Sequence, residues 1–250
     1  MKRQFSVVLF VLLIAALALS ACGGGASTKV RVATDATWPP FESVDEATKE
    51  IVGFDADLIK AIAEKENLEI ELLNVSWDPL LAGMAQCQYD AAISAMTITE
   101  ERKQSFNFSD PYFAAGQVVT VRNDNTDITG KDALSGKTIG VQLGTTGDIE
   151  AQNIAGAEVK NYDDIGLAFQ DLLNGQIDAV IADNPLALGY IGQNAGKLKT
   201  AGDVFTDEFY GIAVCKTNTD LLAKLNSGLA KVKADGVIDQ LSKKWIEGQE

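Results

Sequence analysis

The chain has 250 residues, of which 46% are hydrophobic and 22% are charged, and it carries a formal net charge of −14 with no histidine. This composition is that of a globular protein long enough for one large domain or two lobes. The acidic balance argues against a nucleic-acid-binding protein. The lack of histidine excludes Ser-His-Asp and Cys-His catalysis and any histidine-ligated metal site, so we expect no metal and no cofactor.

The first residues have the pattern of a lipoprotein signal. Lys2 and Arg3 precede an uninterrupted apolar run, Val7–Leu19, which is short for a membrane span and typical of a signal peptide. Residues 19–23 resemble a bacterial lipobox, in which the cysteine is acylated. We predict a signal peptide at 1–21 and a lipidated Cys22 with a flexible linker at 22–28. An ordinary cleaved signal is the alternative. The body of the chain is then extracytoplasmic, in the periplasm or on the outer cell surface, and anchored to the membrane.

The first part of the body alternates strands and helices, which predicts a mostly parallel sheet with helices on both faces. Asp55 is a plausible N-cap of the first helix. Ligands of such sheets bind outside the carboxyl ends of the strands, where Asp35, Trp38, Trp77 and Ser94–Thr97 fall. The predicted elements are strands at 30–33, 68–72 and 91–95 and helices at 55–67 and 80–85.

The segment Asp90–Phe113 is the centre of the predicted site. Its strand runs into Met96–Thr99 and then into a helix that opens at Thr99. Backbone N–H groups at such a junction suit an anion, and Arg102 adds a planar two-pronged donor that fits a carboxylate. We therefore predict that this junction binds the α-carboxylate of a small ligand. The alternative is a surface arginine that pairs with a nearby acid.

A second strand–helix set begins near residue 138, and its features suggest a second lobe. Its loop Gly144–Gly147 suits an anion but has neither the Walker nor the dinucleotide spacing. Two such sets, the second embedded in the first, predict one lobe of residues 29–116 plus 210–250 and another of residues 117–209. Hinge crossings are expected near 115–121 and 207–212. The other predicted elements are strands at 118–121, 138–141, 177–182 and 209–214 and helices from 148, at 165–174, 186–194, 221–232 and 237–246.

Six segments in this order resemble the polar amino-acid periplasmic binding proteins of ABC importers, extracellular solute-binding protein family 3. The segments are Gly53–Leu58, Asp90–Arg102, Phe108–Tyr112, Gly140–Gly147, Ile177–Asp183 and Tyr210–Val214. The resemblance covers Val30–Ile246. It implies a type II α/β Venus-flytrap fold whose two lobes, joined by two hinge strands, close on one amino acid. It also implies a monomer that delivers the amino acid to the transmembrane subunits of an ABC transporter.

The resemblance also implies roles for individual residues. Arg102 would bind the ligand carboxylate together with Thr97 and Thr146, and Asp183 would bind the α-ammonium with help from Ser94. Ala95 stands where relatives often have serine or glycine, so only its backbone can contribute. The implied pocket walls are Trp38, Phe54 and Trp77, with Asp35 and Gln142 at the polar end. The full implied set is Asp35, Trp38, Phe54, Trp77, Ser94, Ala95, Met96, Thr97, Arg102, Gln142, Thr145, Thr146 and Asp183.

The side chain of the ligand is less constrained by the sequence than its backbone groups. Three aromatic residues with Asp35 suit a guanidinium or ammonium group, which favours arginine or lysine. Glutamine is the second candidate, and the tryptophans could instead serve only to limit ligand size. A different class of function is an extracytoplasmic dehydratase-like enzyme of the same fold, with Asp35 or Glu42 as its general acid. No paired carboxylate motif supports that alternative.

The two cysteines of the body, Cys87 and Cys215, are both predicted in the first lobe. An extracytoplasmic compartment is oxidising and permits a disulfide. The sequence does not give their separation, so their pairing is a hypothesis at this point.

Overall fold

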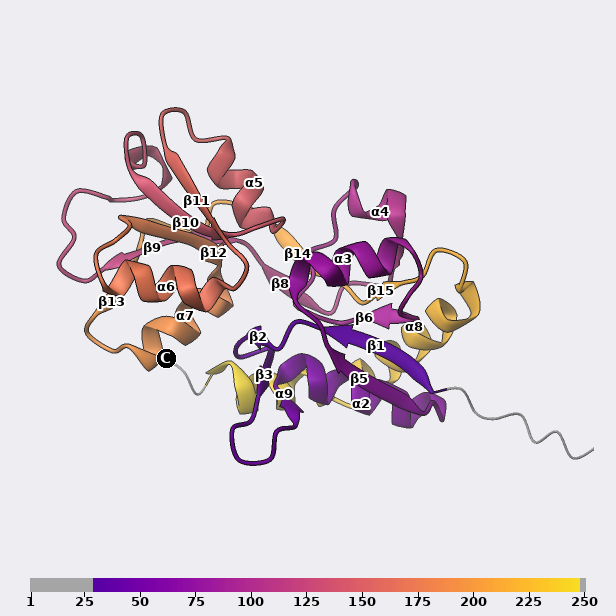
Figure 1. The fold of residues 1–250 in the computed structure, drawn as a ribbon. Coiled ribbons are helices and arrows are strands. Elements are labelled where there is room, and N and C mark those ends of the chain that lie inside the picture. The colour runs from indigo at the N-terminus through magenta and orange to yellow at the C-terminus, as the bar shows by residue number, and fades with distance from the viewer. Residues whose placement is uncertain (1–28, 248–250) are drawn as a thin grey trace, which may run out of the picture.

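The computed structural model describes residues 29–247, and these form two lobes that each contain a five-stranded sheet (Figure 1). The predicted signal peptide and Cys22 lie outside the described residues. Within 29–247, none of the helices combines the length and the apolar character needed to cross a bilayer.

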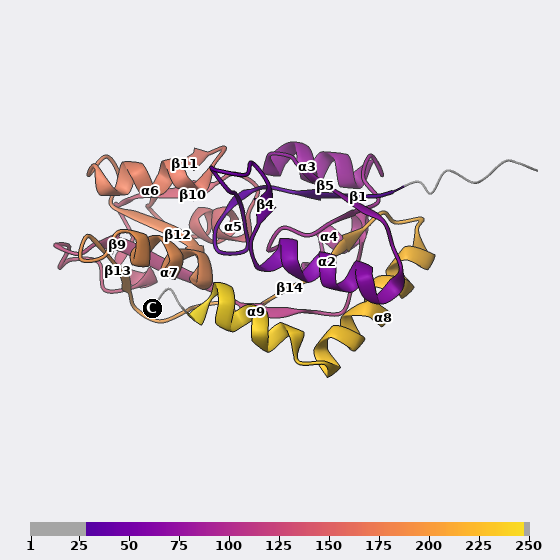
Figure 2. The ribbon, with the colours of Figure 1, turned by 90° about the horizontal axis from the view of Figure 1, so that it is seen from below.

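The first lobe is built on a mixed sheet of strand order β5-β1-β6-β15-β7. The strand β1 pairs in parallel with β5 and β6, whereas β15 runs antiparallel to its neighbours β6 and β7. Figure 2 shows α3 on one face of this sheet and α2 and α8 on the other. The bounds are β1 Val30–Thr34, α2 Phe54–Glu66, β5 Ile70–Asn74, α3 Trp77–Ala85, β6 Ala91–Ala92, β7 Asn107–Phe108, β15 Ala213–Val214, α8 Thr219–Ala234 and α9 Val237–Trp245.

The second lobe has the strand order β11-β10-β12-β9-β13, in which only β9 runs against the others. Residues of β12 alternate between two cores: Ile181 packs in the cluster that contains Ala151 of α5, and Val180 in the cluster that contains Phe169 of α6. The bounds are β9 Gln117–Arg122, a 3-10 turn at Lys131–Ala133, β10 Thr138–Gln142, α5 Thr146–Gln152, β11 Glu158–Tyr162, α6 Ile165–Leu173, β12 Ala179–Asp183, α7 Asn184–Gln193 and β13 Leu198–Ala201.

Two connecting strands join the lobes, as the sequence predicts. The strand β8 (Phe113–Ala115) pairs antiparallel with β14 (Glu208–Tyr210). The chain enters the second lobe through β8 and leaves it through β14, so all strands of the second sheet come from the segment between these two crossings. The first lobe is therefore built from two separate stretches of chain, and the second lobe from the one continuous stretch between them.

Several elements differ from the sequence-based expectation. A small sheet, β2 (Thr37–Trp38), β3 (Glu42–Val44) and β4 (Ile51–Val52), forms where a loop is expected, and it carries Trp38. The edge strands β11 and β13 are too polar to show a clear apolar pattern. The helix expected from Thr99 is only a four-residue turn, α4 (Arg102–Ser105), so the junction does not open a long helix.

The start of α2 also corrects a prediction. The N-cap is Gly53 and not Asp55, and the Asp55 side chain is buried. Gly53 has φ 134°, and an added Cβ would stand 2.1 Å from the Phe41 carbonyl oxygen. Only glycine therefore fits this close approach between α2 and the chain that leads into β3.

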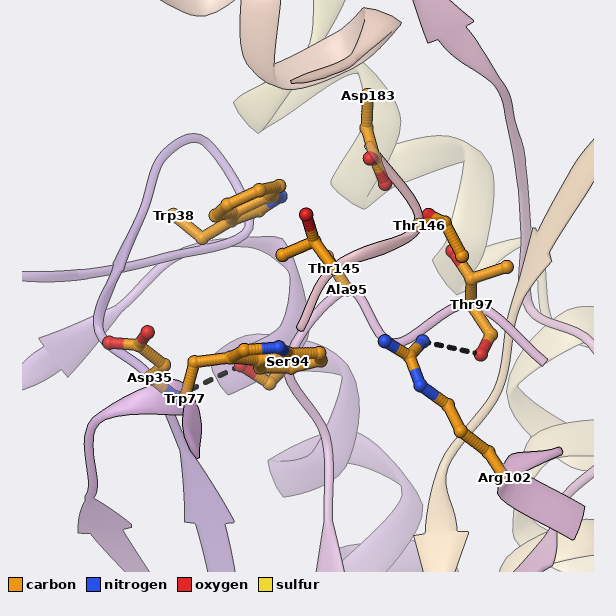
Figure 3. A pocket seen from close by; sticks show the side chains of 10 residues that line it. All are labelled: Asp35, Trp38, Trp77, Ser94, Ala95, Thr97, Arg102, Thr145, Thr146 and Asp183. Atoms are coloured by element: carbon orange, nitrogen blue, oxygen red, sulfur yellow. Dashed lines mark hydrogen bonds between the residues drawn. The ribbon is translucent and has the colours of Figure 1, made fainter. Parts of the chain in front are cut away.

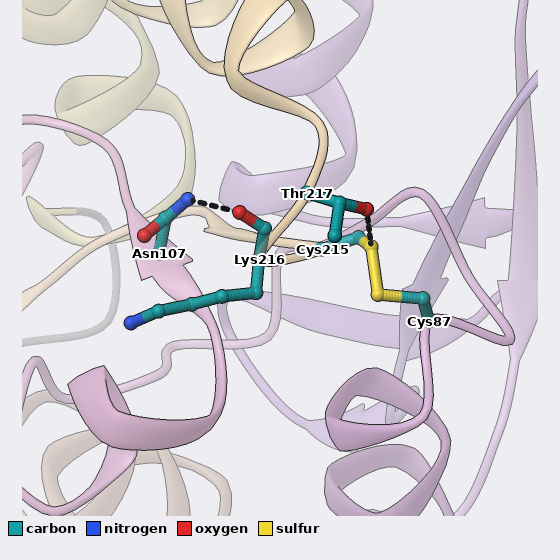
Figure 4. Close-up of a disulfide and its surroundings, with 5 residues drawn as sticks. All are labelled: Cys87, Asn107, Cys215, Lys216 and Thr217. Atoms are coloured by element: carbon teal, nitrogen blue, oxygen red, sulfur yellow. Dashed lines mark hydrogen bonds between the residues drawn. A yellow bond between two sulfur atoms is a disulfide. The ribbon is translucent and has the colours of Figure 1, made fainter.

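The pairing of Cys87 with Cys215 is confirmed, with a Cα–Cα distance of 5.1 Å (Figure 4). The disulfide joins the chain just beyond α3 to the residue that follows β15. It closes a separation of 128 residues that includes the whole second lobe.

Candidate functional site

One cavity lies between the lobes, with an empty volume of about 310 Å³. Every residue that lines it belongs to the set implied by the sequence (Figure 3). The lining residues are Asp35, Trp38, Trp77, Ser94, Ala95, Thr97, Arg102, Thr145, Thr146 and Asp183.

The cationic side of the cavity is Arg102. Its Nη1 donates to the Thr97 carbonyl oxygen at 2.8 Å and its Nη2 to the Gly144 carbonyl oxygen at 3.1 Å. The guanidinium lies 5.1 Å from the centre of the Trp77 ring, and Figure 3 shows it pointing into the cavity. Burial lowers its pKa to about 10, although the charges of Asp183 and Glu208 oppose this shift. Arg102 therefore remains a fixed cation at neutral pH.

An acidic side faces it from the second lobe. Asp183 ends β12 and accepts hydrogen bonds from Gln117 Nε2 at 2.6 Å and the Tyr210 hydroxyl at 2.5 Å. Burial, followed by the nearby charge of Glu208, raises the Asp183 pKa to about 7, and these hydrogen bonds and Arg102 act in the opposite direction. A carboxylate in this setting gains stability from any cationic group that enters the cavity.

Glu208 is a buried acid that the sequence reasoning missed. Its Oε2 accepts hydrogen bonds from the hydroxyls of Thr97 at 2.7 Å and Thr146 at 2.8 Å, one from each lobe. Its Oε1 accepts from Thr206 at 2.9 Å and from Gln117 at 3.2 Å. The signal available in the sequence was an acidic residue within the predicted hinge crossing 207–212. Because Glu208 engages both threonine hydroxyls, their protons are not directed to a ligand carboxylate in this structure.

The far end of the cavity is aromatic and acidic. Trp38 and Trp77 are both largely buried, and Figure 3 shows their rings edge-on on opposite sides of the space. Asp35 lies at this end and accepts from Thr37 Oγ1 at 3.0 Å and from Gln142 Nε2 at 3.0 Å. Burial raises the pKa of Asp35. This end therefore combines two π faces with one carboxylate.

The lobes are closed onto each other in this structure. Gln142 of the second lobe donates to Asp35 of the first, and Arg102 of the first lobe donates to the Gly144 carbonyl of the second. These contacts lie on the two sides of the cavity. A molecule within it would contact both lobes.

Three residues of the predicted set do not line the cavity. Gln142 acts from behind through Asp35. Phe54 is fully buried, with its ring 5.6 Å from that of Phe41 and 5.5 Å from that of Phe113, because the first turn of α2 points into the core of the lobe. Met96 is fully buried in the cluster beside α3.

The geometry gives little support to the enzyme alternative. Glu42 has no exposed surface and lies behind Ser94, so it does not reach the cavity. Asp35 is at the cavity but is engaged by Thr37 and Gln142. Within residues 29–247 no group of three or more acidic, histidine or cysteine side chains could hold a metal ion.

Two α/β lobes that close through two hinge strands over a small charged cavity define a solute-binding protein. The sequence model of the bacterial extracellular solute-binding proteins, family 3, matches residues 30–248, and the chain belongs to this family. The family membership predicted from the six sequence segments is thus confirmed.

Named relatives agree with this class, and they are binding proteins rather than enzymes. The chain is 40% identical over 243 residues to ABC transporter arginine-binding protein 1 of Escherichia coli (strain K12), which covers 94% of this chain and 98% of the relative. It is similar to a solved ancestral arginine-binding protein bound to arginine, with a TM-score of 0.83, 43% identity and coverage of 87% and 97%. The ancestral arginine-binding protein bound to glutamine gives a TM-score of 0.82, 44% identity and the same coverage.

Proposed function

We propose that this chain is the substrate-binding lipoprotein of an ABC amino-acid importer and that it captures a basic L-amino acid, arginine or lysine. The observation that carries the proposal is the placement of Arg102 opposite Asp183 across a cavity of about 310 Å³. An amino acid is a zwitterion, so a site for its backbone groups needs one fixed cation and one fixed anion. The two lobes supply one each.

The acid excess of the cavity supports a ligand with a second positive charge. Arg102 is opposed by Asp183 and Glu208 near one end, and Asp35 stands at the other. A bound arginine or lysine would place its side-chain cation between the rings of Trp38 and Trp77 and beside Asp35. The arginine-binding relatives support the same preference.

Glutamine is the second candidate. The ancestral arginine-binding protein has also been solved with glutamine, so a protein similar to this chain accepts a neutral amide ligand. In this chain Asp35 could accept from a ligand amide as well as from a guanidinium. The two ligands share their backbone contacts and differ only in how much they gain from the charge of Asp35.

Lobe closure would couple capture to delivery. A ligand that contacts both lobes favours the closed form by its differential affinity for that form. The interlobe hydrogen bonds of Arg102 and Gln142 stabilise the closed form even without ligand, and they would break when the lobes open. A lipid on Cys22 would keep the body near the transmembrane subunits of the importer.

The test of the proposed function is a thermal-shift screen of the body of the chain against the twenty amino acids. The protein is first unfolded and refolded to remove any carried-over ligand. A ligand at 100 times its Kd stabilises the folded state by about 2.7 kcal/mol, which is easily detected. We expect the largest shifts with L-arginine or L-lysine. A shift with glutamine alone would overturn the basic specificity, and no shift with any amino acid would overturn the function.

The anchor has a separate test. The full chain is expressed in a bacterial host fed with labelled palmitate, beside the variant Cys22→Ala. We expect label and membrane association for the wild type only. Equal membrane association of both proteins without label would contradict the lipid anchor and leave the ligand proposal unaffected.

A further inference from the structure

A second group of buried acids lies behind the cavity. Glu42, at the start of β3, and Asp55, in the first turn of α2, both have no exposed surface. They are brought together by the close approach of Gly53 to the Phe41 carbonyl. No lysine or arginine among the described residues forms an ion pair with either of them.

Each of these acids uses one oxygen to hold the floor of the cavity. Glu42 Oε1 accepts from Ser94 Oγ at 2.8 Å, and Ser94 Oγ in turn accepts from the backbone N–H of Asp35 at 2.9 Å. Asp55 Oδ2 accepts from the backbone N–H of Ala95 at 2.7 Å and from the Tyr112 hydroxyl at 2.7 Å. The pair is therefore connected to three residues that line the cavity.

The other oxygen of each acid has no donor from another group. Glu42 Oε2 and Asp55 Oδ1 are both buried, and neither accepts a hydrogen bond from a group outside the pair. Two neighbouring buried carboxylates cannot both be ionised at low cost. One proton shared between them satisfies both oxygens. Burial, the charge of Asp55 and the contact between the two carboxyl groups all raise the pKa of Glu42 well above its ordinary value.

The backbone that Asp55 holds is in an unfavourable conformation. Ala95 has φ 43°, in the left-handed region, which is unfavourable for a residue with a Cβ. The hydrogen bond from its N–H to Asp55 offsets this cost and fixes the path of the segment Ser94–Thr97. That segment carries the floor of the cavity and the carbonyl that holds Arg102.

We propose that Glu42 and Asp55 share one proton and act together as positioning residues, holding Ser94 and Ala95 in the conformation that binds ligand. The pair is not a ligand site. The charged or titratable groups that face it are Asp35 beyond Ser94 and the hydroxyls of Tyr112 and Tyr210. None of these is a cation at neutral pH, so the shared proton is the only charge compensation that these neighbours leave.

The first experiment needs no ligand and compares the wild type with Glu42→Gln. The glutamine amide keeps an acceptor for Ser94 and a permanent N–H donor for Asp55. The pKa of Glu42 is raised on folding, so its stabilising contribution is complete below the unfolded pKa near 4.5 and is lost as pH rises through the folded value. Between the unfolded and the folded pKa of Glu42, the unfolding constant of the wild type should rise with pH relative to that of the variant. The rise is up to about tenfold per pH unit.

Denaturant unfolding at a series of pH values from 5 to 9 measures this slope, with Asp57→Asn in the same helix as the control. A common slope for wild type and Glu42→Gln would overturn the shared proton. We expect Asp57→Asn to follow the wild type, because Asp57 instead contacts Lys244 and Trp245 at the surface.

The second experiment measures positioning and rests on the proposed function. The probe is L-arginine, or L-glutamine if only that ligand shifts the wild type. We expect Glu42→Gln to bind within about threefold of the wild type. Glu42→Ala, which leaves Ser94 without its acceptor and Asp55 without its proton, should bind at least about tenfold more weakly. Equal weakening by both variants, or by neither, would overturn the positioning role.

If Glu42→Ala does not fold, Glu42→Met, which fills a similar volume and likewise offers neither an acceptor to Ser94 nor a proton to Asp55, takes its place in the comparison. A wild type that binds no amino acid would contradict the proposed function alone, because the pH slope is measured without ligand.

Discussion

Two buried acid groups stand on opposite sides of the same short segment, Ser94–Thr97, and they differ in what surrounds them. In front, Asp183 and Glu208 have Arg102 near them and accept hydrogen bonds from hydroxyl and amide groups. Behind, Glu42 and Asp55 have no cation among their neighbours. Arg102 therefore favours the charged form of Asp183, which can meet a ligand, whereas the rear acids have no such cation and share a proton that holds the scaffold. Burial alone does not identify a binding acid; the neighbouring charges do.

Removal of the cation in front should have the largest effect. Arg102→Ala takes away the only cation that lines the cavity within the described residues and leaves a ligand carboxylate beside Asp183 and Glu208. Losing one partner of a buried charge pair costs about 2–5 kcal/mol, or roughly 30- to 5,000-fold in affinity. Calorimetric titration with L-arginine measures the loss. Arg102→Lys, which keeps the charge without the two-pronged geometry, is the control and should lose less; binding near wild-type strength by Arg102→Ala would refute the assignment.

Removal of the disulfide should lower stability and leave ligand affinity unchanged. Replacing Cys87 and Cys215 together by alanine should lower the free energy of unfolding by about 2–5 kcal/mol, because the bridge closes a long loop. Neither cysteine lines the cavity, so affinity should stay within about twofold. Chemical denaturation and ligand titration of the same preparation check both numbers. A large loss of affinity with unchanged stability would place the disulfide in the binding mechanism.

The front acid should give binding a pH dependence of defined sign. The pKa of Asp183 is raised from 3.8 to about 7 in the ligand-free protein, and only the carboxylate attracts an ammonium group. Affinity should therefore fall as pH drops below about 7, by up to tenfold per pH unit. The ligand-free chain, by the same shift, should lose stability as pH rises from 3.8 to about 7.

Asp183→Asn tests that assignment directly. It should weaken binding at neutral pH by about 1.5–3 kcal/mol, or roughly 10- to 150-fold, and flatten the acid limb of the profile. Titrations of wild type and variant between pH 5 and pH 8 measure both effects. An unchanged acid limb in Asp183→Asn would mean that another group titrates.

The sequence located the charged groups of the front better than their partners. Arg102 and Asp183 could be predicted because each follows a strand in a recognisable segment. The link from Thr97 and Thr146 to Glu208 could not, since it joins residues 111 and 62 positions apart. The strands β11 and β13 were missed because an edge strand need not be apolar.

The rear pair was misread for a related reason. The spacing around Asp55 predicts a helix cap, and the sequence suggests Glu42 only as the general acid of an enzyme. Their burial depends on Gly53, where an exceptional backbone geometry brings two segments together. A sequence pattern reports which residues share a face but not which buried oxygens lack a donor.

The smallest effect should come from the far end of the cavity. Asp35→Asn keeps the shape of the side chain and removes its charge. L-arginine should lose about 1 kcal/mol, or roughly fivefold in affinity, and L-glutamine should lose less. Parallel titrations with both amino acids measure the difference. Equal losses would show that Asp35 supports the fold of this end and does not select a cation.

The measurement that tests the central claim most directly compares an amino acid with its decarboxylated amine. Refolded wild type and Arg102→Ala are titrated with L-arginine and agmatine, and with L-glutamine and γ-aminobutyramide as a second pair. For the pair whose amino acid binds, we expect the wild type to bind the amine at least about 100-fold more weakly, and Arg102→Ala to bind both compounds equally weakly. Wild-type affinities that agree within about threefold would contradict the account, because the cation in front would then not be holding a carboxylate.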